Sequence, residues 1–326
     1  MRCLLDVLGG QPARACGSDT EGLALLQVAG EENVLPWIAD RLISIQDQLP
    51  SGLRNAAFDI QREARHRAFV WTSSLRETLA AFHQRDIPVI SLKGPWLGER
   101  LYGDAALRSC SDLDLLVRPA HVSAAEGLLA ELGFLPCGPW DDRHRRLRRI
   151  NIDVELHHSV ENPLVFDFEI ERAWDRALFL PFHGVAAQIL SPSDELLFLC
   201  LHSVHHCFER LSLLLDLAFA FQKLPLPDLA FFTSDGPEFR NMIALCWLMV
   251  ERLRSPLPIP RLSDPWLGNR PRLDKVAEAL WRERIVQPEA PFEFAAAHRF
   301  TTISSVVFFL KIADPGRRKL LRLVRY

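Results

Sequence analysis

The sequence contains no apolar run long enough to cross a membrane, and its N-terminus lacks the arrangement of a signal peptide. Its seven cysteines form no C-x-x-C pair and no even framework, which indicates reduced thiols. The chain has no internal repeat and no low-complexity tract. These absences predict a soluble protein of the cytoplasm without a membrane span.

The chain also lacks an excess of charge of either sign. Lysine and arginine total 38 against 41 aspartates and glutamates, so the formal net charge is -3 and gives no global argument for binding nucleic acid. Two basic clusters keep a nucleic acid open as a partner, although such clusters are more often solvated faces. They are Arg143, Arg145, Arg146, Arg148 and Arg149, and, near the C-terminus, Arg317, Arg318, Lys319, Arg322 and Arg325. The first cluster leads directly into Glu155, where it would attract a nucleotide or a phosphorylated acceptor.

Apolar residues recur at helical intervals in residues 21–84 and again after Pro192. The later helices are predicted at residues 195–207, 211–223 and 239–253. Between these helical segments, short apolar runs broken by proline and glycine indicate strands that alternate with helices. The predicted strands are residues 87–92 and 112–117, with one short and one long strand within 134–158; the predicted helices between them are residues 95–102 and 120–132. The sequence therefore predicts an α+β fold, in which a small mixed sheet lies between helical segments.

Two carboxylates, Asp112 and Asp114, lie two residues apart in an otherwise apolar run. Side chains at positions i and i+2 of a strand point to one face, so we expect these two acids to project together. Two adjacent negative charges repel unless a cation lies between them, and hard oxygen ligands favour Mg²⁺ or Mn²⁺. Taken alone, an Asp-x-Asp pair is more often a solvated strand end.

A second acidic segment favours a functional acid pair over a solvated strand end. Residues 150–157 alternate apolar and polar side chains, which is the period of a half-buried strand. The polar face of this strand carries Asn151, Asp153, Glu155 and His157. If the two strands are neighbours, a third carboxylate reaches the first pair. Three acids on adjacent strands, near a glycine turn at Lys93-Gly94, are typical of two-metal phosphoryl and nucleotidyl transfer.

Four motifs follow one another in a recognisable order. They are Lys93-Gly94; Arg108 with Ser111-Asp112-Leu113-Asp114-Leu115-Leu116-Val117; Val154-Glu155-Leu156-His157-His158; and Leu199-Cys200-Leu201-His202 running on to Leu214-Leu215-Asp216-Leu217-Ala218. Together they resemble the uncharacterised nucleotidyltransferase family of the DNA polymerase beta-like superfamily. The resemblance implies a nucleotidyltransferase catalytic core at residues 86–185, between an N-terminal helical region at 1–85 and a C-terminal helical region at 186–326.

The resemblance also implies roles for particular residues. Those expected to bind metal and carry catalysis are Asp112, Asp114 and Glu155. Those expected to bind the nucleotide are Lys93, Gly94 and Arg108. Asp153 is a reserve for Glu155, and His157 would orient Glu155. The implied reaction is the Mg²⁺-dependent (or Mn²⁺-dependent) transfer of a nucleoside monophosphate from a nucleoside triphosphate to an unidentified acceptor, such as a peptide or a small metabolite.

One departure from the wider superfamily supports an alternative function. Pro95 follows Gly94 where a small hydroxyl residue is expected, and proline removes an amide donor from the turn that would hold the triphosphate. The alternative is a catalytically degenerate protein of the same fold, which binds a nucleotide or a partner without chemistry.

The C-terminal helical region carries two further candidate residues. His202 and His206 are spaced i and i+4, so they share a helix face, and with the acid pair they would suit a metal-dependent phosphohydrolase as a third interpretation. Asp216 lies in an apolar helix, where a carboxylate is costly unless it is paired. We expect Asp216 to meet Arg210, a histidine of the preceding helix or the catalytic core.

Overall fold

The computed structural model describes residues 2–10, 18–138, 144–160, 168–227, 236–253, 259, 261–262, 270–282 and 285. Arg143 and the C-terminal basic cluster lie outside the described residues. The chain divides into two compact units: Met1–Ala57 with Leu196–Tyr326, and Phe58–Glu195. The division into three regions at residues 85 and 185 stays a prediction.

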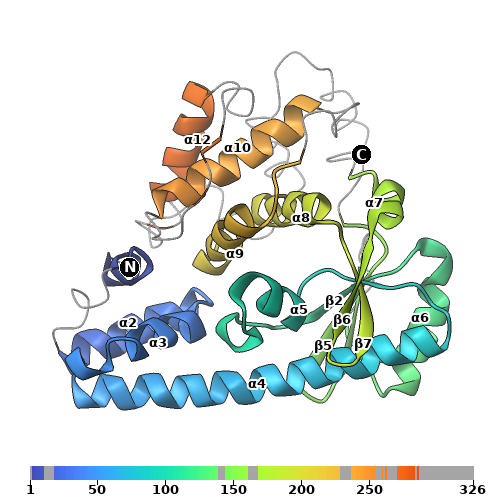
Figure 1. Ribbon diagram of the computed structural model, residues 1–326, viewed down its shortest axis with the longest axis horizontal. Helices are drawn as coiled ribbons and strands as arrows, with labels where there is room; N and C mark the ends of the chain where they lie inside the picture. Colours follow the sequence, from blue (N-terminus) through green and yellow to red (C-terminus); the bar gives the residue numbers. More distant parts are fainter. Residues whose placement is uncertain are drawn as a thin grey trace. The chain divides into compact units, whose positions relative to one another are not determined.

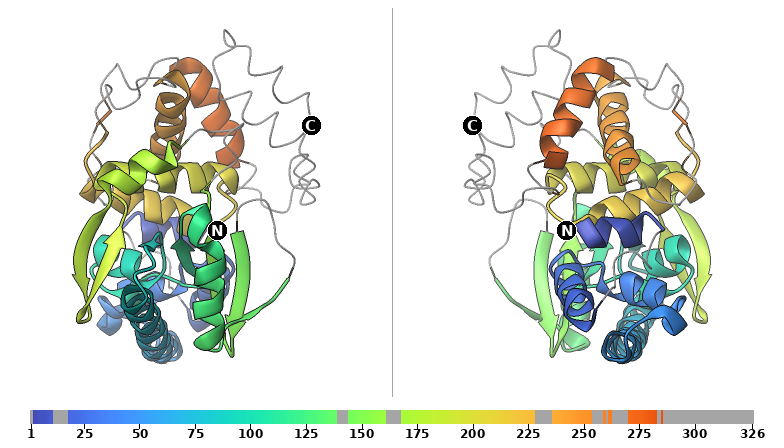
Figure 2. Two further views of the ribbon diagram at one scale, coloured as in Figure 1. Left: turned by 90° about the vertical axis from the view of Figure 1, so that its right-hand side faces the viewer. Right: turned by 90° about the vertical axis from the view of Figure 1, so that its left-hand side faces the viewer.

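The unit formed by Phe58–Glu195 contains a seven-stranded mixed sheet (Figure 1). Its strands are β1 (Ile90–Ser91), β2 (Leu113–Leu116), β3 (Leu135–Pro136), β4 (His144–Arg149), β5 (Ile152–His157), β6 (Leu178–Phe182) and β7 (Val185–Ile189), in the order β3-β4-β5-β2-β1-β7-β6. β2 runs parallel to β5 and β1 runs parallel to β7, whereas the remaining pairs are antiparallel. Figure 2 shows the yellow-green β6–β7 hairpin and the green strands at opposite edges of the sheet.

Two helices, α4 (Ser51–Gln84) and α6 (Val122–Glu131), supply the core that covers one face of this sheet. Apolar side chains of α4 and α6 pack with alternate residues of β2 and β5, including Leu113, Leu115 and Leu156. Because successive side chains of a strand point to opposite faces, the intervening residues project from the other face of the sheet. The shorter elements of the unit are α5 (Pro95–Leu97), η3 (Gly98–Tyr102), η4 (Ala105–Leu107), η5 (Pro119–His121) and α7 (Ile170–Arg176).

The other unit is helical and combines segments from both ends of the chain. Its elements are α1 (Arg2–Leu8), α2 (Asp19–Glu31), α3 (Leu35–Ile43), η2 (Gln46–Gln48), α9 (Leu211–Lys223), α10 (Gly236–Arg252) and α12 (Arg270–Trp281), and most of α8 (Pro192–His205) also belongs to it. The Glu32 carboxylate accepts a hydrogen bond of 2.8 Å from the backbone N–H of Leu211, and Arg210 donates to the carbonyl oxygen of Glu31. These bonds join the end of α2 to the start of α9.

The predicted α+β class, with a mixed sheet between helical segments, is confirmed. The predicted helix at 211–223 coincides with α9. Strand β1 is shorter than predicted, at Ile90–Ser91, because Pro88 before it cannot donate to a ladder. The β6–β7 hairpin was not predicted, and the described arginines of the first cluster, Arg145, Arg146, Arg148 and Arg149, lie in strand β4. Within the described residues, no helix combines the length and the apolar character that a membrane crossing needs.

Candidate active site

Four neighbouring strands bring charged side chains together on the sheet face opposite α4 and α6. The parallel register of β2 and β5 sets Asp114 beside Glu155. The antiparallel register of β5 and β4 sets Glu155 beside Arg146. Lys93 follows β1 at the other side of β2. A charged row therefore crosses the sheet in the order Lys93, Asp114, Glu155, Arg146.

Asp114 lies at the centre of this row, and its side chain is only 1% exposed. Its Oδ1 atom lies 3.1 Å from Nζ of Lys93 and 3.2 Å from Nε2 of His157. The same His157 nitrogen lies 3.7 Å from Oε2 of Glu155. One ligand atom each from Asp114, Glu155 and His157 lie within 4.8 Å of one another. In the described part of the chain, no other group of three His, Cys, Asp or Glu side chains has this spacing.

The donor set fits a divalent cation. Carboxylate oxygens favour Mg²⁺ and Mn²⁺, and an imidazole nitrogen is a further common metal donor. Two of the three predicted ligands, Asp114 and Glu155, come together here. His157 was predicted only to orient Glu155, but its Nε2 atom lies where it would bind the same ion.

Asp112 comes directly before β2 and is partly buried. Burial is the main cause that raises the pKa of its carboxyl group to about 6; repulsion from Asp114 and Glu155 acts in the same direction, and Lys93 opposes it. The Ser111 hydroxyl donates to Oδ2 of Asp112 at 3.0 Å. Asp112 therefore lies within electrostatic reach of both other acids, at the edge of the three-residue group.

Lys93 is the buried cation of the site, at 8% exposure. Burial alone would lower the pKa of its ammonium group, but attraction to Asp114 and Asp112 outweighs that effect and the pKa is raised. Arg108, predicted to bind the nucleotide with Lys93, lies near enough to repel it. The two cations are therefore neighbours beside the acids.

Gly94 makes the turn that follows Lys93. Its backbone has φ 78° and ψ -151°, a region that is essentially limited to glycine. A Cβ atom added there would lie 3.5 Å from Cδ2 of Leu113. Pro95 occupies the first position of α5, where a missing N–H costs nothing because the helix has no acceptor for it. The Gly94-Pro95 pair therefore forms a tight turn that lies next to Asp112 and Leu113.

Asp153 and Cys110 lie close to the site residues in the sequence but do not join the three-residue group. Both oxygens of Asp153 accept hydrogen bonds from Arg148, at 2.6 and 2.7 Å, and these bonds lower the pKa of the Asp153 carboxyl group. The structure therefore does not bring this reserve residue into the three-residue group. Burial raises the pKa of the Cys110 thiol to about 12, so it stays protonated at neutral pH and is a poor nucleophile.

The two candidates from the C-terminal region belong to the helical unit. The rings of His202 and His206 lie 4.6 Å apart between centroids, and Nδ1 of His206 lies 3.3 Å from Oε1 of Glu209. Asp216 is buried in α9, at 4% exposure. None of these side chains belongs to the three-residue group on the sheet.

The sequence indicated that the first arginine cluster as a whole would attract a nucleotide or a phosphorylated acceptor near Glu155, but it did not single out Arg146 and assigned no role to His144. Arg146 donates to Oε1 of Glu155 at 2.8 Å, and Nε2 of His144 lies 3.8 Å from the same oxygen. The two-residue turn at Ile150-Asn151 would have predicted this pairing, because a two-residue loop sets the register of a hairpin.

The other described arginines of β4 hold the strand in place. Arg148 binds Asp153, as described above. Arg145 forms an ion pair with Glu126 of α6 at 3.1 Å, and Arg149 one with Glu77 of α4 at 2.7 Å. Arg146 is therefore the member of the cluster that lies at the acidic site.

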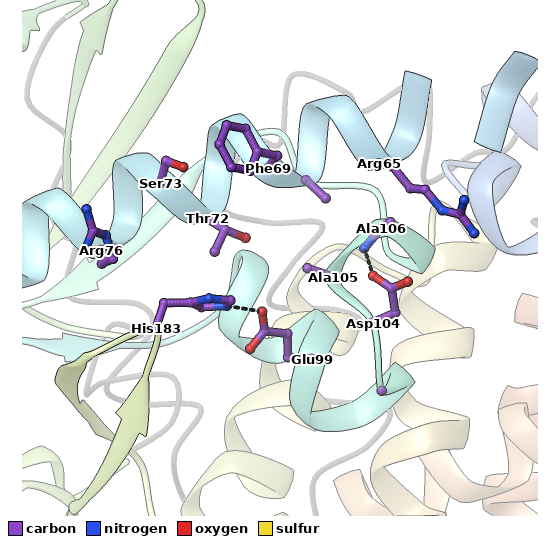
Figure 3. A pocket seen from close by; sticks show the side chains of 12 residues that line it. Arg65, Phe69, Thr72, Ser73, Arg76, Glu99, Asp104, Ala105, Ala106 and His183 are labelled. Carbon is purple, nitrogen blue, oxygen red and sulfur yellow. Dashed lines mark hydrogen bonds and ion pairs between the residues drawn. The ribbon is translucent and has the colours of Figure 1, made fainter. Parts of the chain in front are cut away.

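A separate trough of about 940 Å³ runs between α4 and the segment from η3 to η4 (Figure 3). Arg65, Phe69 and Arg76 line it from α4. On the facing wall, Glu99 contacts His183 at 2.6 Å. No residue of the charged row lines this trough, so it is distinct from the acidic site.

The fold is a mixed sheet that holds Asp114, Glu155 and the buried Lys93 together on one face. The chain belongs to the family of uncharacterised nucleotidyltransferases, whose family model matches residues 18–236. This match confirms the resemblance that the four sequence motifs indicated. No curated protein matches the chain.

Two solved structures show a remote likeness. The first is the crystal structure of ANT(2'')-Ia in complex with adenylyl-2''-tobramycin: 14% identity, 46% of this chain and 86% of that chain covered, and a TM-score of 0.36. The second is the solution structure of the antibiotic-resistance factor ANT(2'')-Ia: 14% identity, 71% and 97% covered, and a TM-score of 0.33. Both likenesses are remote, so the family assignment rests on the family model.

Proposed function

We propose that the protein is a Mg²⁺-dependent (or Mn²⁺-dependent) nucleotidyltransferase that transfers a nucleoside monophosphate from a nucleoside triphosphate to a hydroxyl group of an acceptor. The observation that carries this proposal is the convergence of Asp114, Glu155 and His157 within 4.8 Å, with Asp112 and Lys93 beside them. Neighbouring carboxylates of this kind carry a repulsive cost that a divalent cation would relieve.

Asp114, Glu155 and His157 would hold metal, with Asp112 as the further carboxylate ligand. In the two-ion form of this chemistry, bound Mg²⁺ or Mn²⁺ stabilises negative charge on the attacking and leaving oxygens. Asp153 is the weaker candidate because Arg148 binds both of its oxygens.

The chain's own residues would bind the phosphates and move the proton. Lys93 and Arg108 neutralise the phosphates, and Gly94 allows the backbone to approach them. Glu155 takes the proton of the acceptor hydroxyl, whose oxygen then bonds to the α-phosphorus. The bond from the α-phosphorus to its bridging oxygen breaks, and pyrophosphate leaves with the electron pair. His202 and Asp216, in the helical unit, would be accessory residues.

The acceptor is proposed to be a peptide or a small molecule.

The free cysteines among the described residues, Cys3, Cys110, Cys137, Cys200, Cys207 and Cys246, suit a reducing compartment. We therefore place the reaction in the cytoplasm.

Incubation with α-labelled nucleoside triphosphates, Mg²⁺ and host extract tests the proposal. The wild-type protein should label an acceptor, and the Asp112→Asn, Asp114→Asn double variant should keep its fold without labelling. Equal labelling by the double variant would refute the assigned site.

A catalytically degenerate binding protein is the second candidate. The observation in its favour is that Lys93 and Arg146 already compensate Asp114 and Glu155 through ion pairs of 3.1 and 2.8 Å. Such a protein would gain thermal stability from Mg²⁺ with ATP, because ligand binds only the folded state, yet would transfer no label.

A further inference from the structure

The order of the strands separates two sides of the proposed reaction centre. Lys93 and Gly94 follow β1, on one side of the acids, and β4 lies on the other side, beyond β5. In phosphoryl transfer, the attacking and leaving oxygens lie roughly in line with the phosphorus atom. If the leaving pyrophosphate lies against Lys93 and Gly94, the acceptor must approach from the β4 side.

On the β4 side, the acceptor would meet a cation. The guanidinium group of Arg146 donates to Oε1 of Glu155 at 2.8 Å, and half of its side-chain surface is exposed. His144 lies beside it, with its ring 5.0 Å from the ring of His157. An arginine has five N–H donors in a planar fork, so Arg146 can bind Glu155 and a second anionic group together.

The other arginines of this strand do not compete for that role. Arg148 is held by both oxygens of Asp153, and Arg145 and Arg149 pair with residues of the helices on the far face of the sheet. On the β4 side of the acids, where the acceptor would approach, the basic side chains are therefore those of Arg146 and His144.

We propose that Arg146, with His144 beside it, binds an anionic oxygen group of the acceptor close to the oxygen that receives the nucleotide. The acceptor is then a phosphate monoester or a carboxylate-bearing molecule, and a polycationic acceptor is disfavoured by repulsion. This inference rests on the proposed nucleotidyl transfer.

The step balances without a further reagent. An acceptor hydroxyl loses its proton to Glu155, and its oxygen forms the bond to the α-phosphorus as pyrophosphate leaves. Arg146 neutralises the anionic group of the acceptor, so that the acceptor can approach the triphosphate.

Calorimetric titration of the full chain tests the proposal. The protein is first saturated with Mg²⁺ and an α,β-methylene triphosphate analogue, which keeps the probes out of the triphosphate site. The probes are glycerol phosphate, glycerate and glycerol, which share a carbon framework and differ in charge. The variants are Arg146→Gln and Arg146→Lys, with Arg145→Gln as the matched control from the opposite face of β4.

The wild type and the Arg145→Gln control should bind an anionic probe about tenfold or more tightly than glycerol, because hydrogen bonds to charged groups are strong. Arg146→Gln should lose that preference, and Arg146→Lys should keep part of it. Preference for glycerol phosphate over glycerate would identify a phosphorylated acceptor, and equal binding a general anion site.

No preference of the wild type for an anion, or an unchanged preference in Arg146→Gln, would overturn the inference. If Arg146→Gln fails to fold, Arg146→Lys provides the test. An Arg146→Lys variant that binds the anionic probes with the affinity and the preference of the wild type would refute the role of the planar guanidinium group. Failure of the wild type to bind the analogue with Mg²⁺ would instead refute the proposed function, so the two failures are distinguishable.

Discussion

Replacement of Asp112 by asparagine should stabilise the metal-free protein while it removes activity. The pKa of Asp112 is raised from 3.8 to about 6, chiefly by burial and then by repulsion from Asp114. A rise of that size corresponds to roughly 3 kcal/mol of cost for the ionised carboxylate in the folded state. Asparagine has nearly the same shape and carries no charge, so the variant escapes that cost.

The sign of the pH dependence follows from proton linkage. The folded protein binds the Asp112 proton more tightly than the unfolded chain, so this group lowers wild-type stability as pH rises from about 4 to about 6. At pH 8 the variant should be more stable by up to roughly 3 kcal/mol, or roughly 5 to 10 °C in its unfolding midpoint. At pH 5 about half of that gain should remain.

Thermal unfolding in EDTA, followed by circular dichroism at pH 5 and pH 8, measures the effect. Asp153→Asn is the matched control, since the Arg148 hydrogen bonds lower the pKa of Asp153 and its neutralisation should cost stability at pH 8. The reasoning is wrong if Asp112→Asn gains no stability at pH 8, or if its gain is the same at both pH values.

Four substitutions test separate parts of the structure. Gly94→Ala should cost about 1 to 3 kcal/mol in urea unfolding and abolish labelling, because its φ of 78° and ψ of -151° strain any side chain; wild-type stability would contradict this. Ile150→Asn should raise stability by roughly 1 kcal/mol, because a β-branched residue at φ 53° is strained and asparagine tolerates that region; a lower urea midpoint would count against it. Asp153→Asn should keep labelling activity, and Glu155→Gln should lose it; the reverse result would exchange the roles of the two acids.

The alternation of side chains was enough to predict the acidic face. Asp114 and Glu155 follow a period of two within apolar runs, so burial of Leu113, Leu115 and Leu156 on one face directs the acids to the other. Helix α9 was also predictable from the sequence, because its buried apolar residues recur along one continuous segment. Local pattern and burial thus predicted the position of each acid within its own strand.

The contacts of these acids with Lys93 and Arg146 do not follow from the alternation within one strand, although the two-residue turn at Ile150-Asn151 indicates the β4–β5 register. Contact between Lys93 and Asp114 depends on β1 pairing beside β2, and contact between Arg146 and Glu155 depends on the β4–β5 register. Strand pairing is set by packing between distant segments as well as by local sequence. The arginine cluster was therefore interpreted as a basic run, more often a solvated face, that leads into Glu155. Its described arginines lie in strand β4, where Arg146 is at the site and Arg145 and Arg149 face the helices.

The position of the label in the triphosphate tests the central claim most directly. Parallel reactions with host extract and Mg²⁺ would contain triphosphates labelled at either the α- or the γ-phosphorus, with wild type and Asp114→Asn. Nucleotidyl transfer at this site predicts an acceptor that carries only the α label, and only with the wild type. Transfer of the γ label, or equal α labelling by Asp114→Asn, would contradict the account.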